Sequence, residues 1–539
     1  MMVWAQELTF TNGVIFINED RYGPNQGSIN FYNYDYDEME YNVYALVNPD
    51  TKLGVTTQQG QVFGGRLFLV SKQANSSEAA GSTVGSRLAV LDAATLQQQA
   101  GLLRFGQSAD SVYDGRSYCA VNNSKGYVAT NAGIFVLNVA SMSVSGPIEG
   151  TQSSARGDYN SLYKEQCGDM MRFGQYVFAV QQGRGVHVID PVADTLVTTL
   201  QFPHVVTVFV TAGGHLFVAN NSREAYDFSS GPDVANFTRI DPVTFETLDV
   251  FELGDGHGAF STWGAWRARM LCVDPVAERV YYYYDEFQNH ISCYDFSSRQ
   301  WIDHFIDLPE AADINWDGTR NHQGLYASAL SFDPHTGDLV VQTLEAAPMY
   351  AYQIFNHNWV LFYDAATATL KRQVRLRDAY WFPAQAVYPD LFAPSVSVNN
   401  QTMTIGQEVV IDLLDAVSDA DNMAALAVTT ACSEDNTIAR AWVEGLELHV
   451  VALAAGQTAV TVTTDSNGKS AATTFTVTVN DGGTLGDLNA DGHLDVADVV
   501  ALISRVLDSA AFDPVADLNG DSLIDVADVV ALIELVLNN

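Results

Sequence analysis

The chain has 539 residues, 47% of them hydrophobic, so it is long enough for two to four domains with ordinary apolar cores. It carries 64 Asp and Glu against 26 Lys and Arg, a formal net charge of −38. This balance excludes nucleic acid and anionic membrane surfaces as general partners, because both bind basic proteins. No apolar run reaches the roughly 20 residues that a membrane span needs, so none is expected.

The N-terminus, MMVWAQELTF, contains Val3-Trp4-Ala5 ahead of Gln6, a pattern typical of a signal-peptide cleavage site. Residues 1–5 are therefore interpreted as a signal-peptide remnant, and the protein is expected to be secreted or on the cell surface. The basic and apolar parts of such a peptide are missing, so truncation and loss of a lipid anchor stay open. The five cysteines are odd in number and lack CxxC spacing, which predicts buried thiols rather than a disulfide framework. They are Cys119, Cys167, Cys272, Cys293 and Cys432.

Residues 6–392 repeat one pattern, in which an apolar strand ends at an Asx residue, a short polar turn follows and another strand begins. An Asx side chain caps the backbone two residues on, so these positions are interpreted as turn residues and not as ligands. Units of about 45 to 55 residues rich in Val, Phe and Tyr are typical of propeller blades. The sequence therefore predicts a mainly β protein that begins with a seven-bladed β-propeller. The seven positions are Asn33, Asp92, Asn138, Asp190, Asp241, Asp295 and Asp364.

The long connections of this region fall between the second and third strands of a unit or between units, which places them on one face of the propeller. They are rich in Tyr, Trp, Asn, Gln and Arg. Flat rings with amides suit a large, partly apolar, hydrogen-bonding ligand or a protein partner. For each ring, packing of the loop itself is the alternative. The connections are residues 18–28, 74–86, 152–165, 220–236, 254–267, 309–324 and 345–358.

The stretches GVIFINEDRYGPNQGSINFYN, VTTQQGQVFGGRLFLVSKQA and YWFPAQAVYPD resemble YncE-like surface propellers of Bacteroidetes, a group that carries a domain of unknown function. The resemblance covers about residues 12–390, and the group includes BtuG-like members that capture cobalamin. It implies a corrinoid on the long-loop face, with rings over the macrocycle and polar side chains on its amides and phosphate. The implied ligand-binding residues are Asn18, Asp20, Arg21, Tyr22, Gln59, Tyr159, Trp263, Trp266, Trp316 and Trp381.

Residues 393–480 differ in composition from the preceding region and contain Val- and Thr-rich segments typical of strands. The dipeptide Asn467-Gly468 near their end predicts a β-hairpin. About 85 residues of this kind predict an immunoglobulin-like β-sandwich, interpreted as a spacer. Residues 481–485 are interpreted as a flexible linker.

Residues 486–539 contain the same loop and helix twice, GDLNADGHLDVADVVALI and ADLNGDSLIDVADVVALI. Oxygen side chains recur at loop positions 1, 3, 5, 9 and 12, the rhythm of a calcium loop, and position 7 offers a backbone carbonyl. The alternative is that these Asp residues only stabilise the N-termini of surface helices. The recurrence of five ligand positions in both copies argues against that alternative. The sequence thus predicts two Ca²⁺ ions. The ligands are Asp487, Asn489, Asp491, His493, Asp495 and Asp498 in the first copy, and Asp517, Asn519, Asp521, Leu523, Asp525 and Asp528 in the second.

Paired loops with Asp at position 12 resemble dockerin domains, small α-helical calcium modules that bind a cohesin partner. The resemblance implies that loop positions 10 and 11 help to choose the partner. These are Val496 and Ala497 in the first copy and Val526 and Ala527 in the second. Residues 481–539 contain twelve acidic residues and one basic residue, Arg505. Because these negative charges repel one another, the module is expected to need cations to fold.

The first hypothesis is a non-enzymatic propeller that captures a corrinoid or comparable ligand, joined to a calcium-dependent module for a cohesin-like partner. The second is a component of polysaccharide binding or degradation, and the third is a protein-interaction scaffold. No GxSxG, HExxH, CxxC, P-loop or Rossmann pattern occurs, so no enzyme is expected. A glycosidase that uses a loop carboxylate pair such as Asp255 and Asp313 remains the alternative.

Overall fold

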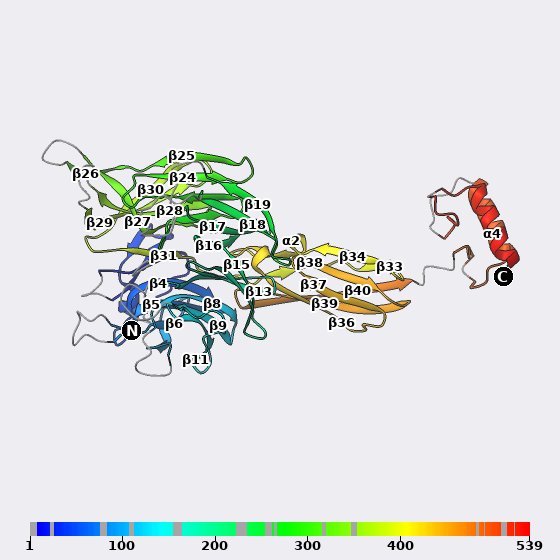
Figure 1. Ribbon diagram of the computed structural model, residues 1–539, viewed down its shortest axis with the longest axis horizontal. Helices are drawn as coiled ribbons and strands as arrows, with labels where there is room; N and C mark the ends of the chain where they lie inside the picture. Colours follow the sequence, from blue (N-terminus) through cyan, green and yellow to red (C-terminus); the bar gives the residue numbers. More distant parts are fainter. Residues whose placement is uncertain are drawn as a thin grey trace, which may run out of the picture. The chain divides into compact units, whose positions relative to one another are not determined.

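The computed structural model is mainly β (Figure 1). Its described residues are 8–21, 26–75, 84–106, 113–154, 164–222, 234–253, 261–263, 267–314, 320–346, 353–480, 485–489, 491–507, 515–521 and 523–538. Within them, the side chains of 261–263, 267–268, 312–314, 353–354 and 538 lie outside the description. In the part of the chain so described, no helix is long and apolar enough to cross a membrane.

The chain divides into two compact units. The first unit consists of Met1–Pro394, Ser418–Val428 and Asp465–Ser470. The second unit consists of Ser395–Val417, Thr429–Thr464 and Ala471–Asn539. Two short segments of the predicted sandwich range are therefore grouped with the propeller range.

Seven antiparallel sheets of four or five strands follow one another in the described residues of the first unit. Sheet 1 consists of β3 (Glu38–Glu40), β2 (Ser28–Asn33), β1 (Gly13–Asn18) and β31 (Pro383–Val387). Sheet 2 consists of β4 (Val55–Phe63), β5 (Arg66–Gln73), β6 (Leu88–Asp92) and β7 (Gln98–Leu102). Sheet 3 consists of β8 (Gly115–Asn122), β9 (Lys125–Thr130), β10 (Gly133–Asn138) and β11 (Ser143–Ser145). Sheet 4 consists of β12 (Cys167–Phe173), β13 (Tyr176–Gln181), β14 (Gly185–Asp190) and β15 (Thr195–Gln201).

The remaining sheets of the first unit keep the same order. Sheet 5 consists of β16 (Val205–Val210), β17 (Leu216–Asn220), β18 (Asn236–Ile240) and β19 (Thr247–Glu252). Sheet 6 consists of β22 (Leu271–Asp274), β23 (Arg279–Tyr282), β24 (His290–Asp295) and β25 (Gln300–Asp307). Sheet 7 consists of β26 (Glu310–Ile314), β27 (Arg320–Phe332), β28 (Asp338–Ala346), β29 (Gln353–Asp364) and β30 (Thr369–Arg375). The additional elements are α1 (Val43–Val47) and the hairpin of β20 (Ser261–Trp263) and β21 (Arg267–Arg269).

The sheets close into a ring because the last strand returns to the first. In sheet 1, β31 pairs with β1, with Ile15 opposite Val387 and Ile17 opposite Gln385. One apolar cluster joins sheet 1 to sheet 2, and another joins sheet 1 to sheet 7. The middle strands are buried on both faces, as in β14, whereas the outer strand β15 is exposed at alternating residues. This burial explains why the strand sequences read as continuous apolar runs.

The seven predicted turn residues cap their turns, which confirms their structural role. Oδ1 of Asp92 accepts hydrogen bonds from the backbone N–H groups of Ala94 and Thr95, at 3.0 and 2.9 Å. Equivalent bonds from the backbone N–H two or three residues on recur at the other six positions. In each case the Asx residue ends the strand next to the outermost strand of its sheet, or follows that strand directly.

In the residue range 393–480, two sheets enclose an apolar core that includes Met403, Leu448 and Phe475. One sheet has the order β33 (Gln401–Thr404), β40 (Lys469–Asn480), β39 (Gly456–Ser466) and β36 (Val428–Ser433). The other has the order β34 (Glu408–Asp412), β38 (Glu447–Ala452) and β37 (Ala439–Glu444). The shorter elements are β32 (Ser395–Val396), α2 (Leu413–Ala416), β35 (Val417–Ser418) and η1 (Ala424–Leu426). The predicted hairpin at Asn467-Gly468 is confirmed, since both residues have positive φ between β39 and β40.

All five cysteines are free thiols, so no disulfide is present among them. Four are buried as predicted, but Cys432 is exposed. It lies at an outward position of β36, an edge strand, where alternate residues face solvent. The prediction of burial was therefore wrong for this one residue, because an apolar-looking strand sequence does not say which residues face outward.

The C-terminal repeat folds as two loop–helix segments with helices α3 (Val496–Leu507) and α4 (Val526–Asn538). Val499, Leu502, Val529 and Leu532 form a small shared core with Ala516. These positions correspond in the two copies, so the duplicated sequence gives a duplicated packing.

Candidate functional site

A cavity of about 370 Å³ lies where the inner strands of the seven sheets meet. Every sheet contributes to its wall. Residues that line it include Gln385, Gln58, Arg116, Asp169, Thr207, Leu271 and Ser328, taken from sheets 1 to 7 in order. The cavity is thus central to the ring.

The wall of this central cavity changes from polar to apolar along the inner strands. On β12, Asp169 precedes Met170 and Met171, and on β16, Thr207 precedes Val210. Each inner strand begins after a connection between sheets. The polar end of the cavity therefore lies on the side of the long connections, where a ligand is expected to enter.

Asp169 of sheet 4 contacts sheet 5 and the β20–β21 hairpin at the polar end. Oγ1 of Thr207 donates to Oδ2 of Asp169 at 2.7 Å, and Nη1 of Arg269 lies 3.6 Å from the same oxygen. The backbone N–H of Arg269 donates to Oγ of Ser328 at 3.1 Å. These contacts hold the charged groups in fixed positions around the opening.

Gln58 lies in the cavity wall, and its side-chain amide forms no hydrogen bond with the described residues. The residue is 8% exposed, and neither its Nε2 nor its Oε1 has a hydrogen-bond partner among the described groups. A buried amide without partners costs about 1–3 kcal/mol, so such a group calls for an explanation in function. A polar group of a ligand in the cavity would supply the missing partners.

Three charged side chains lie beside this polar end; Lys72 and Arg116 are buried and Glu19 is half-buried. Glu19 follows β1, Lys72 is near the end of β5, and Arg116, which is 3% exposed, begins β8. Burial raises the pKa of Glu19 to about 8, although the charges of Lys72 and Arg116 act against that rise. Burial also lowers the pKa of Lys72 to about 8. Perturbed values of this kind concentrate at functional sites.

A second cavity, of about 460 Å³, brings several predicted ligand-binding residues together. Its wall includes Asp20, Tyr380 and Trp381. The guanidinium of Arg21 lies 5.4 Å from the centre of the Tyr380 ring. Nδ2 of Asn18 donates to Oγ of Ser28, another wall residue, at 3.3 Å. Burial raises the pKa of Asp20 to about 7.

Two predicted ligand-binding residues are already engaged by the protein. Oε1 of Gln59 accepts from the backbone N–H of Tyr118 at 2.9 Å, and Nε2 donates to the carbonyl of the same residue at 3.4 Å. Gln59 therefore joins sheets 2 and 3. Trp381 is 7% exposed, and its Nε1 donates to the carbonyl of Arg377 at 2.7 Å.

The other predicted aromatic residues cannot be placed. Tyr22, Tyr159, Trp266 and Trp316 lie outside the described residues, as does the side chain of Trp263 in β20. The carboxylate pair suggested for a glycosidase cannot be placed either, because Asp255 and the side chain of Asp313 lie outside the described residues.

The sequence prediction missed Glu19, Gln58, Lys72, Arg116 and Asp169. One available signal was a charged residue inside an otherwise apolar strand, as in GRSYCAV and CGDMMRF. Such residues are rarely buried unless they are paired or functional. What the sequence does not show is that these strands converge.

In the first C-terminal loop, the side chain of Asp498 organises the backbone. Oδ1 accepts from the N–H groups of Leu488 and Asn489 at 2.8 and 3.2 Å, and Oδ2 accepts from Asp495 at 3.0 Å. Asp498 is fully buried, and backbone hydrogen bonds hold its pKa below the usual value despite that burial. Hydrogen bonds to the charged form have this effect on a carboxylate.

The second loop repeats these bonds. Asp528 accepts from Leu518, Asn519 and Asp525 at 2.9, 3.2 and 2.9 Å. In the described part of the chain, the carboxylates of neither loop form a group of three whose ligand oxygens all lie within 4.8 Å of one another. The carboxylates instead bond to loop N–H groups, and a cation would gather them further.

The two helices expose matching apolar residues. On α3 these are Val496, Val500, Ile503 and Leu507, which are 41% to 78% exposed. On α4 the corresponding positions are Val526, Val530, Ile533 and Leu537, which are 39% to 79% exposed. The predicted docking residues Ala497 and Ala527 are also exposed, beside the first position of each row. Rows of exposed apolar side chains mark interaction surfaces.

Residues 12–389 match a family described as "Domain of unknown function (DUF5074)", and the chain belongs to this family. No curated protein matches the sequence.

Similar solved structures include two from Bacteroides thetaiotaomicron. A quinonprotein alcohol dehydrogenase-like protein shares 14% identity over 71% of this chain and 79% of its own, with a TM-score of 0.45. The extracellular domain of a protein described as a hybrid two-component system shares 14% identity over 88% of this chain and 56% of its own, with a TM-score of 0.36. The chain thus spans just over half the length of that second structure. A β-propeller domain of Swd1 from Myceliophteria thermophila shares 9% identity over 63% of this chain and 95% of its own, with a TM-score of 0.39.

Proposed function

We propose that this member of the DUF5074 family is a secreted or surface-exposed ligand-binding protein. Its seven sheets are the blades of a seven-bladed propeller, and the ligand binds at the polar end of the central cavity. The observation that carries the proposal is the unpartnered amide of Gln58 in a cavity walled by Arg116 and Asp169. Groups of both charge signs and an open amide suit a ligand rich in amides, hydroxyls or phosphate.

The size of the cavity decides how a corrinoid would sit. A corrin ring with its nucleotide tail is much larger than about 370 Å³, so the macrocycle lies outside the cavity at its polar end and one polar substituent enters the cavity. The second cavity, with Asp20, Tyr380 and Trp381, then receives part of the rim. The proposed activity is binding without catalysis.

The rest of the chain serves attachment in this proposal. Residues 393–480 are an immunoglobulin-like spacer, and residues 486–539 are a dockerin-like module with two Ca²⁺ ions. The duplicated hydrogen bonds of Asp498 and Asp528 and the matching apolar rows on α3 and α4 support it. The partner is a cohesin-like protein that presents an apolar face. Binding of glycans within a polysaccharide-degrading assembly is the second candidate, because the same rows suit such an assembly.

The test is equilibrium binding of cyanocobalamin to the full chain, followed by visible absorption after gel filtration. Co-elution of one corrinoid per chain is expected, with affinity reduced at least about tenfold in Gln58→Leu. Asp241→Asn is the matched control, since Asp241 caps a turn at the opposite end of the strands. If no corrinoid is retained, the same variants are titrated with oligosaccharides. Binding of neither class, or equal binding by Gln58→Leu, overturns the proposal.

A further inference from the structure

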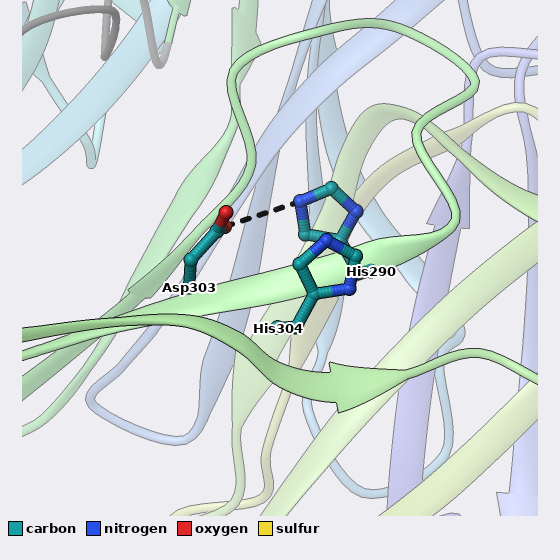
Figure 2. Close-up of side chains that lie close together, drawn as sticks. All are labelled: His290, Asp303 and His304. Atoms are coloured by element: carbon teal, nitrogen blue, oxygen red, sulfur yellow. Dashed lines mark ion pairs between the residues drawn. The ribbon is translucent and has the colours of Figure 1, made fainter.

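Sheet 6 carries a group of side chains that the proposed ligand site does not use. His290, Asp303 and His304 each offer a ligand atom, and these atoms all lie within 4.8 Å of one another (Figure 2). His290 begins β24, and the other two lie on β25, the outermost strand of the sheet. Among the residues that the structure describes, this is the only such group of His, Cys, Asp or Glu side chains.

A β-bulge brings the three side chains together. Ile291 pairs with Ile306 and Cys293 with Ile302, so residues 303–305 all stand opposite one residue of β24. In a regular strand, successive side chains point to opposite faces, and Asp303 and His304 would separate. The bulge, at which His304 has φ of 49°, turns both of them toward His290. Bulges that re-aim side chains in this way are common at functional sites.

The contacts inside the group leave ligand atoms available. Oδ1 of Asp303 lies 3.3 Å from Nε2 of His290 without hydrogen-bond geometry. The two imidazole rings are stacked, with centres 3.7 Å apart, as Figure 2 shows. The side chain of His290 is only 12% exposed, whereas that of His304 is 53% exposed.

A second layer of polar groups orients the first. Nδ1 of His304 lies 2.6 Å from Oδ1 of Asp307, and Oγ of Ser292 donates to Oδ1 of Asp303 at 2.9 Å. A carboxylate on one ring nitrogen fixes the tautomer and leaves the other nitrogen for a metal. For His304 the free atom is Nε2.

We propose that His290, Asp303 and His304 bind a divalent transition metal, best matched by Zn²⁺. Two imidazole nitrogens and one carboxylate oxygen form a donor set that suits this ion. Because the two rings are stacked and an imidazole lone pair lies in the ring plane, metal binding requires the exposed His304 ring to turn out of the stack so that its Nε2 points toward the ligand atoms of the other two residues. Three protein ligands leave one coordination position for water or for a donor from a bound molecule. This site is independent of the proposed ligand cavity and of the calcium loops.

The test is a Zn²⁺ titration of the full chain against a chromophoric chelator, with Ca²⁺ present so that the C-terminal loops are occupied. Co²⁺ is the spectroscopic probe, because tetrahedral N/O coordination gives visible absorption bands. The key variant is His304→Asn, since Asn tolerates the positive φ at this position and an exposed side chain is replaced. His215→Asn is the matched control, because His215 also pairs with a carboxylate, Glu278 at 2.8 Å, but belongs to no such group among the described residues.

The expected result is one Zn²⁺ per chain in the wild type and in His215→Asn. His304→Asn and Asp303→Asn are expected to bind at least about 100-fold more weakly, and Asp307→Asn about tenfold more weakly, as an orienting residue. The Co²⁺ bands disappear in the first two variants. Absence of stoichiometric Zn²⁺ binding by the wild type overturns the proposal, as does equal affinity in His304→Asn.

Discussion

The C-terminal repeat and the central cavity of the first unit place charged groups by different means. In the repeat, the residues from Asp487 to Asp498 lie within one loop, and the second copy repeats their hydrogen bonds. In the cavity, Gln58, Arg116 and Asp169 come from the inner strands of three sheets. The carboxylates differ accordingly. Backbone hydrogen bonds lower the pKa of Asp498, whereas burial raises that of Glu19.

We expect the loop carboxylates to keep their positions without the rest of the fold, because their hydrogen bonds are local. The cavity residues, in contrast, come together only when the ring closes. The loops need only their own backbone N–H groups to position their carboxylates. The cavity exists only where β31 completes sheet 1 and the ring closes. The two regions should therefore respond separately to cations, pH and mutation.

The largest expected effect is the removal of calcium. Chelation by EGTA should unfold residues 486–538 and leave the first unit folded, because the acidic loops repel themselves without cations. Limited proteolysis with mass spectrometry measures the protection of each region. The double variant Asp498→Asn/Asp528→Asn should lose protection even in calcium, whereas Asp435→Asn, in an exposed turn, should not. Unchanged protection of the repeat in EGTA would contradict its assignment as a calcium module.

The next effect concerns pH and Glu19. Its pKa is 4.5 in the unfolded reference and about 8 in the folded chain, so the folded chain binds more protons between these values. The free energy of unfolding of the first unit should therefore fall as pH rises from 4.5 to 8, by about 4 kcal/mol from this group. Chemical denaturation at several pH values checks this.

Glu19→Gln isolates the contribution of that carboxyl group. The variant keeps the shape of the side chain and removes the titration, so its stability should fall less steeply with pH than that of the wild type. An identical pH slope in the two proteins would show that Glu19 is not buried as a protonated acid. The calcium dependence of the C-terminal repeat should be the same in both.

A smaller effect separates two neighbouring glutamines. Gln58→Leu should raise the free energy of unfolding by about 1–2 kcal/mol, because a buried amide without partners is replaced by an apolar group of similar size. Gln59→Leu should lower it by about 1–3 kcal/mol, because two hydrogen bonds to Tyr118 are lost. Urea titration measures both. Destabilisation by Gln58→Leu would show that its amide has partners in the folded chain.

The smallest effect is at the turn residues. Asp92→Ala should cost about 1 kcal/mol, because Oδ1 of Asp92 accepts three hydrogen bonds from Ala94 and Thr95. Asp92→Asn should recover most of the loss, since Asn138 caps the equivalent turn of sheet 3. A thermal scan distinguishes them. Equal losses in the Ala and Asn variants would mean that charge, and not the cap, matters at this position.

Much of the secondary structure follows from local sequence. The hairpin at Asn467-Gly468 lies between β39 and β40 as predicted, and the Asx turns lie where the side chains cap the backbone. The repeated loop and helix were also evident in the sequence, because the residues concerned lie within one short segment; calcium binding by these loops stays a prediction. Other features depend on tertiary contacts, such as the short helix α1 and the segments 418–428 and 465–470 that group with the first unit.

The candidate site was less predictable than the fold. Gln59 was expected at a ligand, but the pairing of sheets 2 and 3 uses its amide, while Gln58 next to it faces the cavity without partners. Alternation along a strand does not tell which of two adjacent glutamines faces inward until the neighbouring sheet is known. The cluster of His290 and His304 was missed for a similar reason, because a bulge is set by strand register and not by spacing.

The most direct test of the account is isothermal titration of the full chain and of Gln58→Leu with cyanocobalamin and with oligosaccharides, in calcium and again in EGTA. The account predicts that one ligand binds the wild type with equal affinity in both buffers and that Gln58→Leu binds it at least about tenfold more weakly. The account would be contradicted if neither ligand class bound. It would also be contradicted if the affinity differed between calcium and EGTA but was the same in the wild type and in Gln58→Leu.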